Sequence, residues 1–419
     1  MKIGIITLNN GSKLIVAKIP ESLSITLMVI TRCGPAFDPP NKSGISHFIE
    51  HLLFKGNTKY PDNEVLSNSL EKYGATSEGF SYHENNAYWI KIPKDNLDIA
   101  IDILTQQIQN SLFKKKDIDY EKKIIQEELS LIKSNPNLLI WELWSQTIFG
   151  NNSLGRIYTG EKEEIKNLTQ KDILEFFKNY YTIENTIFVV SGDVEIKDVK
   201  QLFDKKINNY SRQLKPKTLL IEPQKKHIKI IYQNTDNLTV IYGFLTIDRF
   251  NKDSHILDLI SYILGMGQGS CLYQNVANQG LTYSIYSSTK HLSSTGYLSI
   301  NFTSKKDNLS LILKKIDQQI NILKKGKITD SQLKRAKGYY VGQLIIQNDT
   351  TDNIASWIGY QAICDTNQIL TIEDKQKIIS EITKKDIIRV ANKYFKTDKR
   401  FLSIIGPIKE KEIKIKLKL

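Results

Sequence analysis

The chain repeats itself, and this repeat constrains its fold more than any other feature of the sequence. Residues 168–194 read LTQKDILEFFKNYYTIENTIFVVSGDV, and residues 382–408 read ITKKDIIRVANKYFKTDKRFLSIIGPI. The two segments align without a gap at one constant offset of 214 residues. Each predicts a helix that is capped by threonine and followed by an apolar strand ending at glycine. The sequence therefore predicts two homologous halves in one chain.

Each half has the size of a single domain. The elements expected in each half follow the order strands, long helix, strands, helices, strand. This order predicts an α+β fold in which a mostly antiparallel sheet is flanked by helices. We expect an N-terminal domain at residues 1–212, a polar and proline-bearing linker at 213–223, and a homologous C-terminal domain at 224–419.

Two of the six histidines lie four residues apart in GISHFIEHLLFKG, residues 44–56. The apolar residues around them predict a short and mostly buried helix. His47 and His51 are one turn apart on it, so their imidazoles can converge on one ion, and Glu50 lies beside that face. The alternative is a pair of hydrogen-bonded core histidines with a glutamate partner. Because burying such groups without strong partners is costly, a zinc ion explains the pattern better. The order H-x-x-E-H is that of the inverzincins.

A catalytic zinc site needs a third protein ligand and an open position for water. The segment 119–134, DYEKKIIQEELSLIKS, predicts an amphipathic helix. On it Glu121 and Glu128 are two turns apart and share nearly the same face, whereas Glu127 points about 100° away. Acids that only solvate a surface helix are the alternative, which suits Glu127 better than the aligned pair.

These motifs resemble those of the pitrilysin-type (inverzincin) zinc metallopeptidases, the family of the mitochondrial processing peptidase and its bacterial relatives. In that family the third ligand is the last glutamate of an E-x6-E pattern, which here runs from Glu121 to Glu128 and ends 77 residues after His51. The phrases NNSLGRIYTGEKEEI at 151–165 and GLTYSIYSS at 280–288 are also similar to the family. The resemblance covers essentially the full chain.

The resemblance implies one zinc ion per chain, with His47, His51 and Glu128 as its ligands. Glu50 would act as the general base in the hydrolysis of a peptide bond. Glu121 would be an auxiliary acid that orients the site from behind the ligands. The implied protein is a zinc-dependent endopeptidase that hydrolyses peptides or unfolded segments inside a chamber formed by dimerisation.

The resemblance also implies that the substrate adds as an extra strand to an exposed strand edge near the metal. The matching residues here are Glu78, Gly79, Phe80 and Ser81. The family usually carries Asn-Ala where this chain carries Glu78-Gly79, which leaves the side-chain contacts there open. Backbone pairing would survive that change.

The second half departs from the motif. His255 aligns with His47, but Leu259 replaces His51, and the helix at 332–348 carries no acidic pair. We therefore expect no second zinc site.

In the family, an arginine and a tyrosine of the second half hold the substrate carbonyl. Tyr283 matches the tyrosine, but residues 253–289 contain no arginine and no lysine. Family members of this length pair as dimers, so we expect a homologous subunit that bears the Arg and Tyr, or a homodimer.

The net charge of +13 does not by itself indicate nucleic-acid binding, because the lysines are scattered and interleaved with acids. No apolar run approaches the roughly 20 residues of a membrane span. The N-terminal sequence predicts two strands around Asn-Asn-Gly, with no room for a signal peptide. Three widely spaced cysteines favour a reducing cytoplasm. The alternative function is a non-catalytic structural subunit of a processing-peptidase-like complex, which the intact metal motif disfavours.

Overall fold

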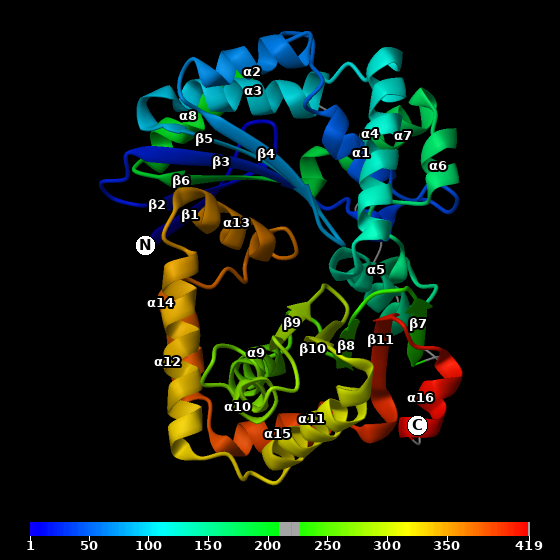
Figure 1. The fold of residues 1–419 in the computed structure, drawn as a ribbon. Helices are drawn as coiled ribbons and strands as arrows, with labels where there is room; N and C mark the ends of the chain where they lie inside the picture. Colours follow the sequence, from blue (N-terminus) through cyan, green and yellow to red (C-terminus); the bar gives the residue numbers. More distant parts are fainter. Residues whose placement is uncertain (209–218, 220–226, 418–419) are drawn as a thin grey trace. The chain divides into compact units, whose positions relative to one another are not determined.

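The computed structural model describes residues 1–208, 219 and 227–417, and its contacts divide the chain into two compact units (Figure 1). The first unit comprises Met1–Ser130, Arg156–Lys217 and Ile346–Thr371, and the second comprises Leu131–Gly155, Thr218–Ile345 and Ile372–Leu419. The predicted linker at 213–223 lies outside the described residues, apart from Leu219. The domain limits 1–212 and 224–419 describe the two sequence repeats, and as limits they stay a prediction.

The elements of the first unit are β1 (Lys2–Thr7), β2 (Lys13–Lys18), β3 (Ser24–Thr31), α1 (Ile45–Leu52), α2 (Asn63–Glu71), β4 (Thr76–Ser81), β5 (Asn86–Pro93), α3 (Leu97–Asn110), α4 (Lys115–Ser134), α6 (Lys162–Asn167), α7 (Gln170–Tyr180), β6 (Thr186–Gly192), α8 (Ile196–Lys206) and α13 (Thr351–Ala362). Those of the second unit are α5 (Pro136–Phe149), β7 (Ile228–Tyr232), β8 (Leu238–Thr246), α9 (Asp253–Leu264), α10 (Cys271–Asn275), β9 (Ile285–His291), β10 (Gly296–Ser304), α11 (Leu309–Lys324), α12 (Asp330–Gln347), α14 (Ile372–Glu381), α15 (Lys384–Tyr394), β11 (Arg400–Gly406) and α16 (Glu410–Leu417). Short 3₁₀ helices are η1 (Pro35–Phe37), η2 (Lys94–Asn96), η3 (Ser153–Gly155), η4 (Ile183–Asn185), η5 (Ala277–Gln279), η6 (Lys306–Asn308) and η7 (Thr397–Lys399).

The repeat seen in the sequence is present in the fold. The elements α15, η7 and β11 begin and end 214 residues after α7, η4 and β6. Both helices start with the same reciprocal cap, in which Thr169 pairs with Asp172 and Thr383 pairs with Asp386. The predicted duplication and the α+β class are therefore confirmed.

The two sheets share one strand order, except that the first sheet has an additional edge strand, β1. The strand order is β1-β2-β6-β3-β5-β4 in the first unit and β7-β11-β8-β10-β9 in the second. The pairs β2–β6 and β7–β11 are parallel, and the other neighbours are antiparallel, as predicted. In the first sheet β4 is one of the two terminal strands, and it pairs with β5 on one side only. Its outer edge is where a further strand would add.

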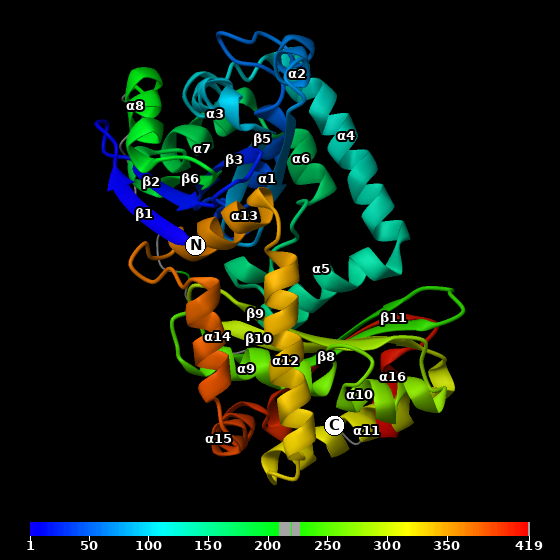
Figure 2. The same ribbon diagram turned by 90° about the vertical axis from the view of Figure 1, so that its left-hand side faces the viewer.

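Alternating residues of β3 face two different apolar layers. Leu27 and Val29 join the main core together with residues of α1, α3 and α8, whereas Met28 and Ile30 pack against α13. Figures 1 and 2 show α3 and α13 on opposite faces of this sheet. The helix α1 thus belongs to the larger of these two layers.

Each unit takes one helix from the other half of the sequence. The helix α5 packs on β8 and β11 of the second unit, where Ser403 Oγ donates a hydrogen bond to Thr147 Oγ1 at 2.8 Å. The helix α13 packs on β3 and β6 of the first unit, where the hydroxyls of Thr26 and Thr351 lie 2.8 Å apart. Within the described part of the chain, no helix is long and apolar enough to cross a membrane.

Candidate metal centre

The helix α1 is anchored at its first residues. The Asp38 carboxylate accepts hydrogen bonds from the backbone N–H of Gly44 at 2.6 Å and of Ser46 at 3.2 Å. Gly44 has a left-handed φ of 83°, and a Cβ there would lie 2.6 Å from the carbonyl oxygen of Thr159. A carboxylate at a helix N-terminus is stabilised by the free N–H groups and by the helix dipole. These contacts set the direction from which α1 presents its side chains.

The two histidines of α1 face each other as their spacing predicts. The Nε2 atoms of His47 and His51 are 3.3 Å apart, and the rings meet edge to face. His47 is 3% exposed. Burial lowers its pKa to about 3, with a further contribution from repulsion by His51. A neutral imidazole is the form that binds metal ions.

The helix α4 brings both predicted glutamates to the histidines. Glu128 Oε2 lies 3.7 Å from His47 Nε2 and 3.8 Å from His51 Nε2. Glu121 is buried, and its Oε2 lies 2.9 Å from His51 Nδ1. Glu127, on the next face of the helix, is exposed. The seven-residue spacing therefore places two carboxylates at one cluster.

Lys55 completes this arrangement, although no motif of the sequence pointed to it. Its Nζ lies 2.5 Å from Glu121 Oε1, while Glu121 Oε2 faces His51. Burial opposes ionisation of Glu121, but the hydrogen bonds from His51 and Lys55 outweigh it and hold the pKa of Glu121 below its usual value. An ionised Glu121 accepts the Nδ1–H of His51, which leaves the Nε2 lone pair directed away from it. Lys55 lies beyond the end of α1 at Leu52, so helical spacing did not predict this contact.

Glu50 lies beside His47 and His51, against strand β4. Its Oε2 is 3.8 Å from His47 Nε2 and accepts a hydrogen bond of 3.4 Å from Ser81 Oγ. A Cβ on Gly79 would lie 2.9 Å from Glu50 Oε1, so glycine leaves the carboxylate its space. Burial raises the pKa of Glu50 to about 7, with His51 opposing the shift and Glu128 adding to it.

The donor atoms fit a zinc ion. Four ligands at zinc bond lengths of about 2.0–2.2 Å stand roughly 3.3–3.6 Å from one another in a tetrahedron. The three distances that join His47 Nε2, His51 Nε2 and Glu128 Oε2 are 3.3, 3.7 and 3.8 Å. His47, Glu50 and His51 also offer donor atoms that all lie within 4.8 Å of one another. Because Glu128 Oε2 is within 4 Å of both imidazoles, it matches the third position better than Glu50 does.

The predicted substrate residues of β4 point to both faces of the sheet. Gly79 and Ser81 face Glu50, whereas Phe80 packs with the apolar layer that includes α13. Glu78 is exposed on the same strand. Tyr283 belongs to the second unit, in the loop before β9, and is 96% exposed. The roles of these residues stay predictions.

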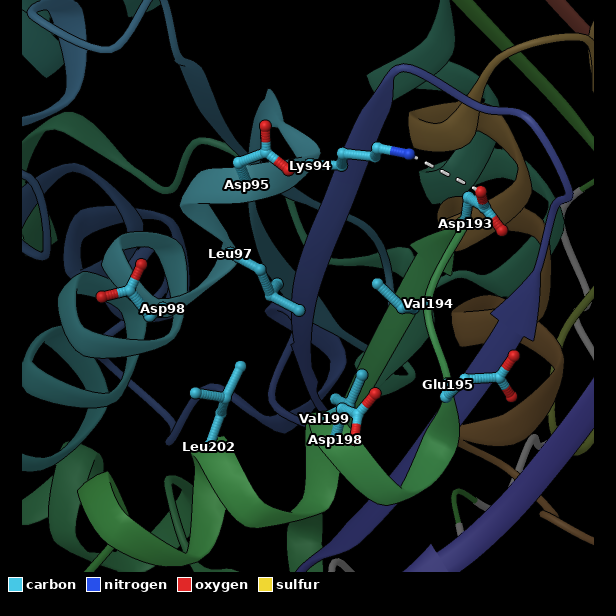
Figure 3. Close-up of a pocket in the computed structure, with 10 residues that line it drawn as sticks. All are labelled: Lys94, Asp95, Leu97, Asp98, Asp193, Val194, Glu195, Asp198, Val199 and Leu202. Atoms are coloured by element: carbon cyan, nitrogen blue, oxygen red, sulfur yellow. Dashed lines mark ion pairs between the residues drawn. The ribbon is translucent and has the colours of Figure 1, made fainter.

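A cavity of about 440 Å³ in the first unit is separate from these residues (Figure 3). It lies where α3 and α8 begin and β6 ends, and Lys94 and Asp193 pair across its rim at 3.8 Å. Its lining includes five carboxylates, of Asp95, Asp98, Asp193, Glu195 and Asp198. None of its lining residues belongs to the cluster around His47.

The second unit carries an ammonium group beside the residues that correspond to His47 and Glu50. Lys375 Nζ donates to His255 Nδ1 at 2.7 Å and to Asp258 Oδ2 at 3.0 Å. Asp258 Oδ1 also accepts from His291 Nε2 at 3.0 Å and from Thr289 Oγ1 at 2.6 Å. Burial opposes ionisation of Asp258, but Lys375 and His291 hold its pKa well below the usual value. A lysine thus supplies the positive charge that this carboxylate needs.

Lys375→Met should destabilise the protein by about 1.5–3 kcal/mol, because the change removes the ammonium group from a largely buried carboxylate and leaves it only the hydrogen bonds from His291 and Thr289. Urea denaturation followed by circular dichroism measures the effect. Lys377→Met is the matched control, since Lys377 lies on the same helix and is exposed. Equal stability of the two variants would contradict the assigned role of Lys375.

The fold and the cluster of His47, Glu50 and His51 define a zinc metallopeptidase with the inverted motif. The family model "Insulinase (Peptidase family M16)" matches residues 14–162, and "Peptidase M16 inactive domain" matches residues 167–340. The chain belongs to this family of zinc-dependent peptidases, and the resemblance predicted from the sequence is confirmed.

Relatives and solved structures agree with this assignment. A protein of Streptomyces coelicolor described as an uncharacterized zinc protease is 26% identical over 97% of this chain and 90% of its own. A probable mitochondrial-processing peptidase subunit beta of Arabidopsis thaliana is 25% identical over 96% of this chain and 78% of its own. The crystal structure of a protease from Helicobacter pylori has the same fold, with a TM-score of 0.89, 23% identity and coverage of 97% of this chain and 100% of that one.

Proposed function

We propose that this chain is an endopeptidase in which His47, His51 and Glu128 hold one zinc ion and Glu50 is the general base. The observation that supports this most is the convergence of the three donor atoms, with separations of 3.3, 3.7 and 3.8 Å. The scaffold alternative draws no support from such a complete donor set, since a structural subunit has no need of it.

The residues of the cluster have different roles in the hydrolysis. Bound zinc would polarise the scissile carbonyl and lower the pKa of the attacking water to about 7. Glu50 takes a proton from that water as the oxygen adds to the carbonyl carbon, and returns the proton to the amide nitrogen as the C–N bond breaks. Glu121 holds His51 in the tautomer with a free Nε2, and Lys55 keeps Glu121 ionised.

The peptide is proposed to bind as an additional strand on the outer edge of β4, at Glu78 to Ser81. The position of β4 at the end of its sheet supports this, because an edge strand has backbone groups free for a new partner. Gly79 and Ser81 contact Glu50, so a peptide on this edge would lie beside the general base. Tyr283 is proposed to contact the substrate carbonyl. A reducing cytoplasm stays the proposed location, since the three cysteines are widely spaced and odd in number.

The direct test is hydrolysis of a fluorogenic unfolded peptide by the purified protein. Treatment with a chelator followed by dialysis should abolish the activity, and one equivalent of zinc should restore it. Hydrolysis that persists after zinc is removed would contradict the proposal.

A second chain is proposed to complete the enzyme, either as a homologous subunit bearing the Arg and Tyr or as a second copy in a homodimer. The support is the absence of arginine and lysine from residues 253–289, ahead of and around Tyr283. A positive donor that faces the developing oxyanion contributes about 10²–10³ in rate.

We expect the isolated chain to be a poor peptidase. Adding a homologue that has the Arg and Tyr but lacks H-x-x-E-H should raise hydrolysis by about 10²–10³. The control is the same homologue with its arginine replaced by alanine. Strong activity of the isolated chain, unchanged by any homologue, would show that no such partner is needed.

A further inference from the structure

A row of four polar residues crosses the first sheet at the end that contacts α1. The row takes one residue from each of four neighbouring strands, β4, β5, β3 and β6, and these residues are Ser81, Asn86, Thr31 and Thr186 in that order. All four are buried, and Leu27 and Val29 on the same face of β3 belong to the main core. Polar side chains in such a place need hydrogen-bond partners, because burial without them is costly.

The two halves of the row use different partners. The two threonine hydroxyls lie 3.1 Å apart, so they join β3 to β6. The other two side chains reach out of the sheet to α1. Asn86 Nδ2 donates to the carbonyl oxygen of Ser46 at 2.7 Å, and Ser81 Oγ donates to Glu50 Oε2 at 3.4 Å. One half of the row therefore holds the strands together, and the other half holds α1 on the sheet.

The Asn86 amide is held in one orientation. A carbonyl oxygen only accepts hydrogen bonds, so the amide nitrogen faces Ser46. The second N–H of this amide donates to the hydroxyl oxygen of Tyr181 at 3.2 Å, and that oxygen lies 2.6 Å from the hydroxyl oxygen of Tyr88. Asn86, Tyr88 and Tyr181 are each at most 1% exposed. The short bond to Ser46 therefore lies where bulk water does not compete for it.

The Ser46 carbonyl belongs to the turn of α1 that carries two of the proposed functional groups. His47 follows it directly, and in an α-helix the same carbonyl accepts the N–H of Glu50. The helix α1 has only eight residues, and so short a helix has little stability of its own. Asp38 holds the first N–H groups of α1, and Asn86 holds a carbonyl of the same turn. Movement of this turn would displace His47 and Glu50 together.

We propose that Asn86 is a positioning residue for peptide hydrolysis, which fixes the turn of His47 and Glu50 against β5. This inference rests on the proposed function of Glu50 and of the zinc site. Asn86 is the partner of Ser81 in the pairing of β5 with β4. The strand proposed to receive the peptide and the turn that carries the general base are therefore joined through two neighbouring residues. A peptide on β4 would meet the Glu50 carboxylate at a fixed distance.

Asn86→Leu removes the donor and keeps most of the side-chain volume. We expect kcat to fall by about ten- to hundredfold, because small displacements of reacting groups are costly, while KM changes by less than about twofold. Zinc affinity, measured by competition with a chelating dye, should fall by about tenfold, because His47 moves with the same turn. Asn86→Ser should give the same result, since its hydroxyl is too short to reach the Ser46 carbonyl. This second variant separates loss of the donor from any effect of the leucine side chain.

Thr31→Val is the matched control. Thr31 lies beside Asn86 in the same row, is equally buried, and pairs its hydroxyl with Thr186. The change removes one buried hydrogen bond, so it should lower the midpoint of urea denaturation and leave the kcat and zinc affinity of the folded protein unchanged. If Asn86→Leu likewise lost stability alone, the inference would be overturned.

Hydrogen–deuterium exchange of residues 44–54 gives a readout that needs neither zinc nor activity. Exchange there should be about tenfold faster in Asn86→Leu than in the wild type, and unchanged in Thr31→Val. Unchanged exchange in Asn86→Leu would overturn the inference, as would a wild-type kcat together with a wild-type zinc affinity. A wild-type protein that binds no zinc, or that cleaves no peptide, would contradict the proposed function instead, and the exchange of α1 would still decide whether Asn86 holds this turn.

Discussion

Glu50→Gln should retain its zinc and lose nearly all peptide hydrolysis. Glutamine keeps the size of the side chain and its contact with Ser81, but it cannot take a proton from water. General-base assistance contributes about 10²–10⁴ in rate, so we expect kcat to fall by about 10²-fold or more. The measurement combines zinc content by metal analysis with hydrolysis of a fluorogenic peptide in the presence of the partner, if one is required.

The control for this variant is Glu71→Gln, which makes the same change at an exposed position of α2. A Glu50→Gln protein that cleaves at the wild-type rate would mean that another group activates the water. A Glu50→Gln protein that loses its zinc would mean that Glu50 is itself a ligand. The distances permit this, since a carboxylate oxygen of Glu50 lies within 4.8 Å of a ring nitrogen of each histidine.

His51→Ala and Glu128→Gln should each lose most of their zinc. The wild-type protein should hold about one zinc ion per chain, since it offers three protein ligands. Removing one of them leaves two, which is too few for a stable site. Glu127→Gln is the matched control, because Glu127 is the neighbouring carboxylate on α4 and is exposed. Full zinc occupancy in both variants would refute the ligand assignment.

Much of the metal centre follows from helical spacing. The one-turn separation of His47 and His51 and the two-turn separation of Glu121 and Glu128 each place a pair on one face of a helix. The structure brings these two faces together, with Glu121 Oε2 at 2.9 Å from His51 Nδ1. The constant offset between the repeats likewise predicts the duplicated fold, because each segment contains its own capping residues and its own apolar strand.

Contacts between distant segments were not predictable in this way. Asn86 and Lys375 reach their partners from parts of the chain with no fixed spacing to the motif helices. The positions of α5 and α13 were equally unpredictable, because each of these helices packs on the sheet formed by the other half of the sequence. An amphipathic pattern shows that a helix buries one face, but it does not show which of two similar sheets receives that face.

The lysine in the second unit has a consequence for how the protein responds to zinc shortage. The cation beside Asp258 is a side chain of the same polypeptide, held at 3.0 Å, whereas the proposed catalytic ion can dissociate. Starvation for the metal would therefore remove the chemistry and leave the fold of the second unit untouched.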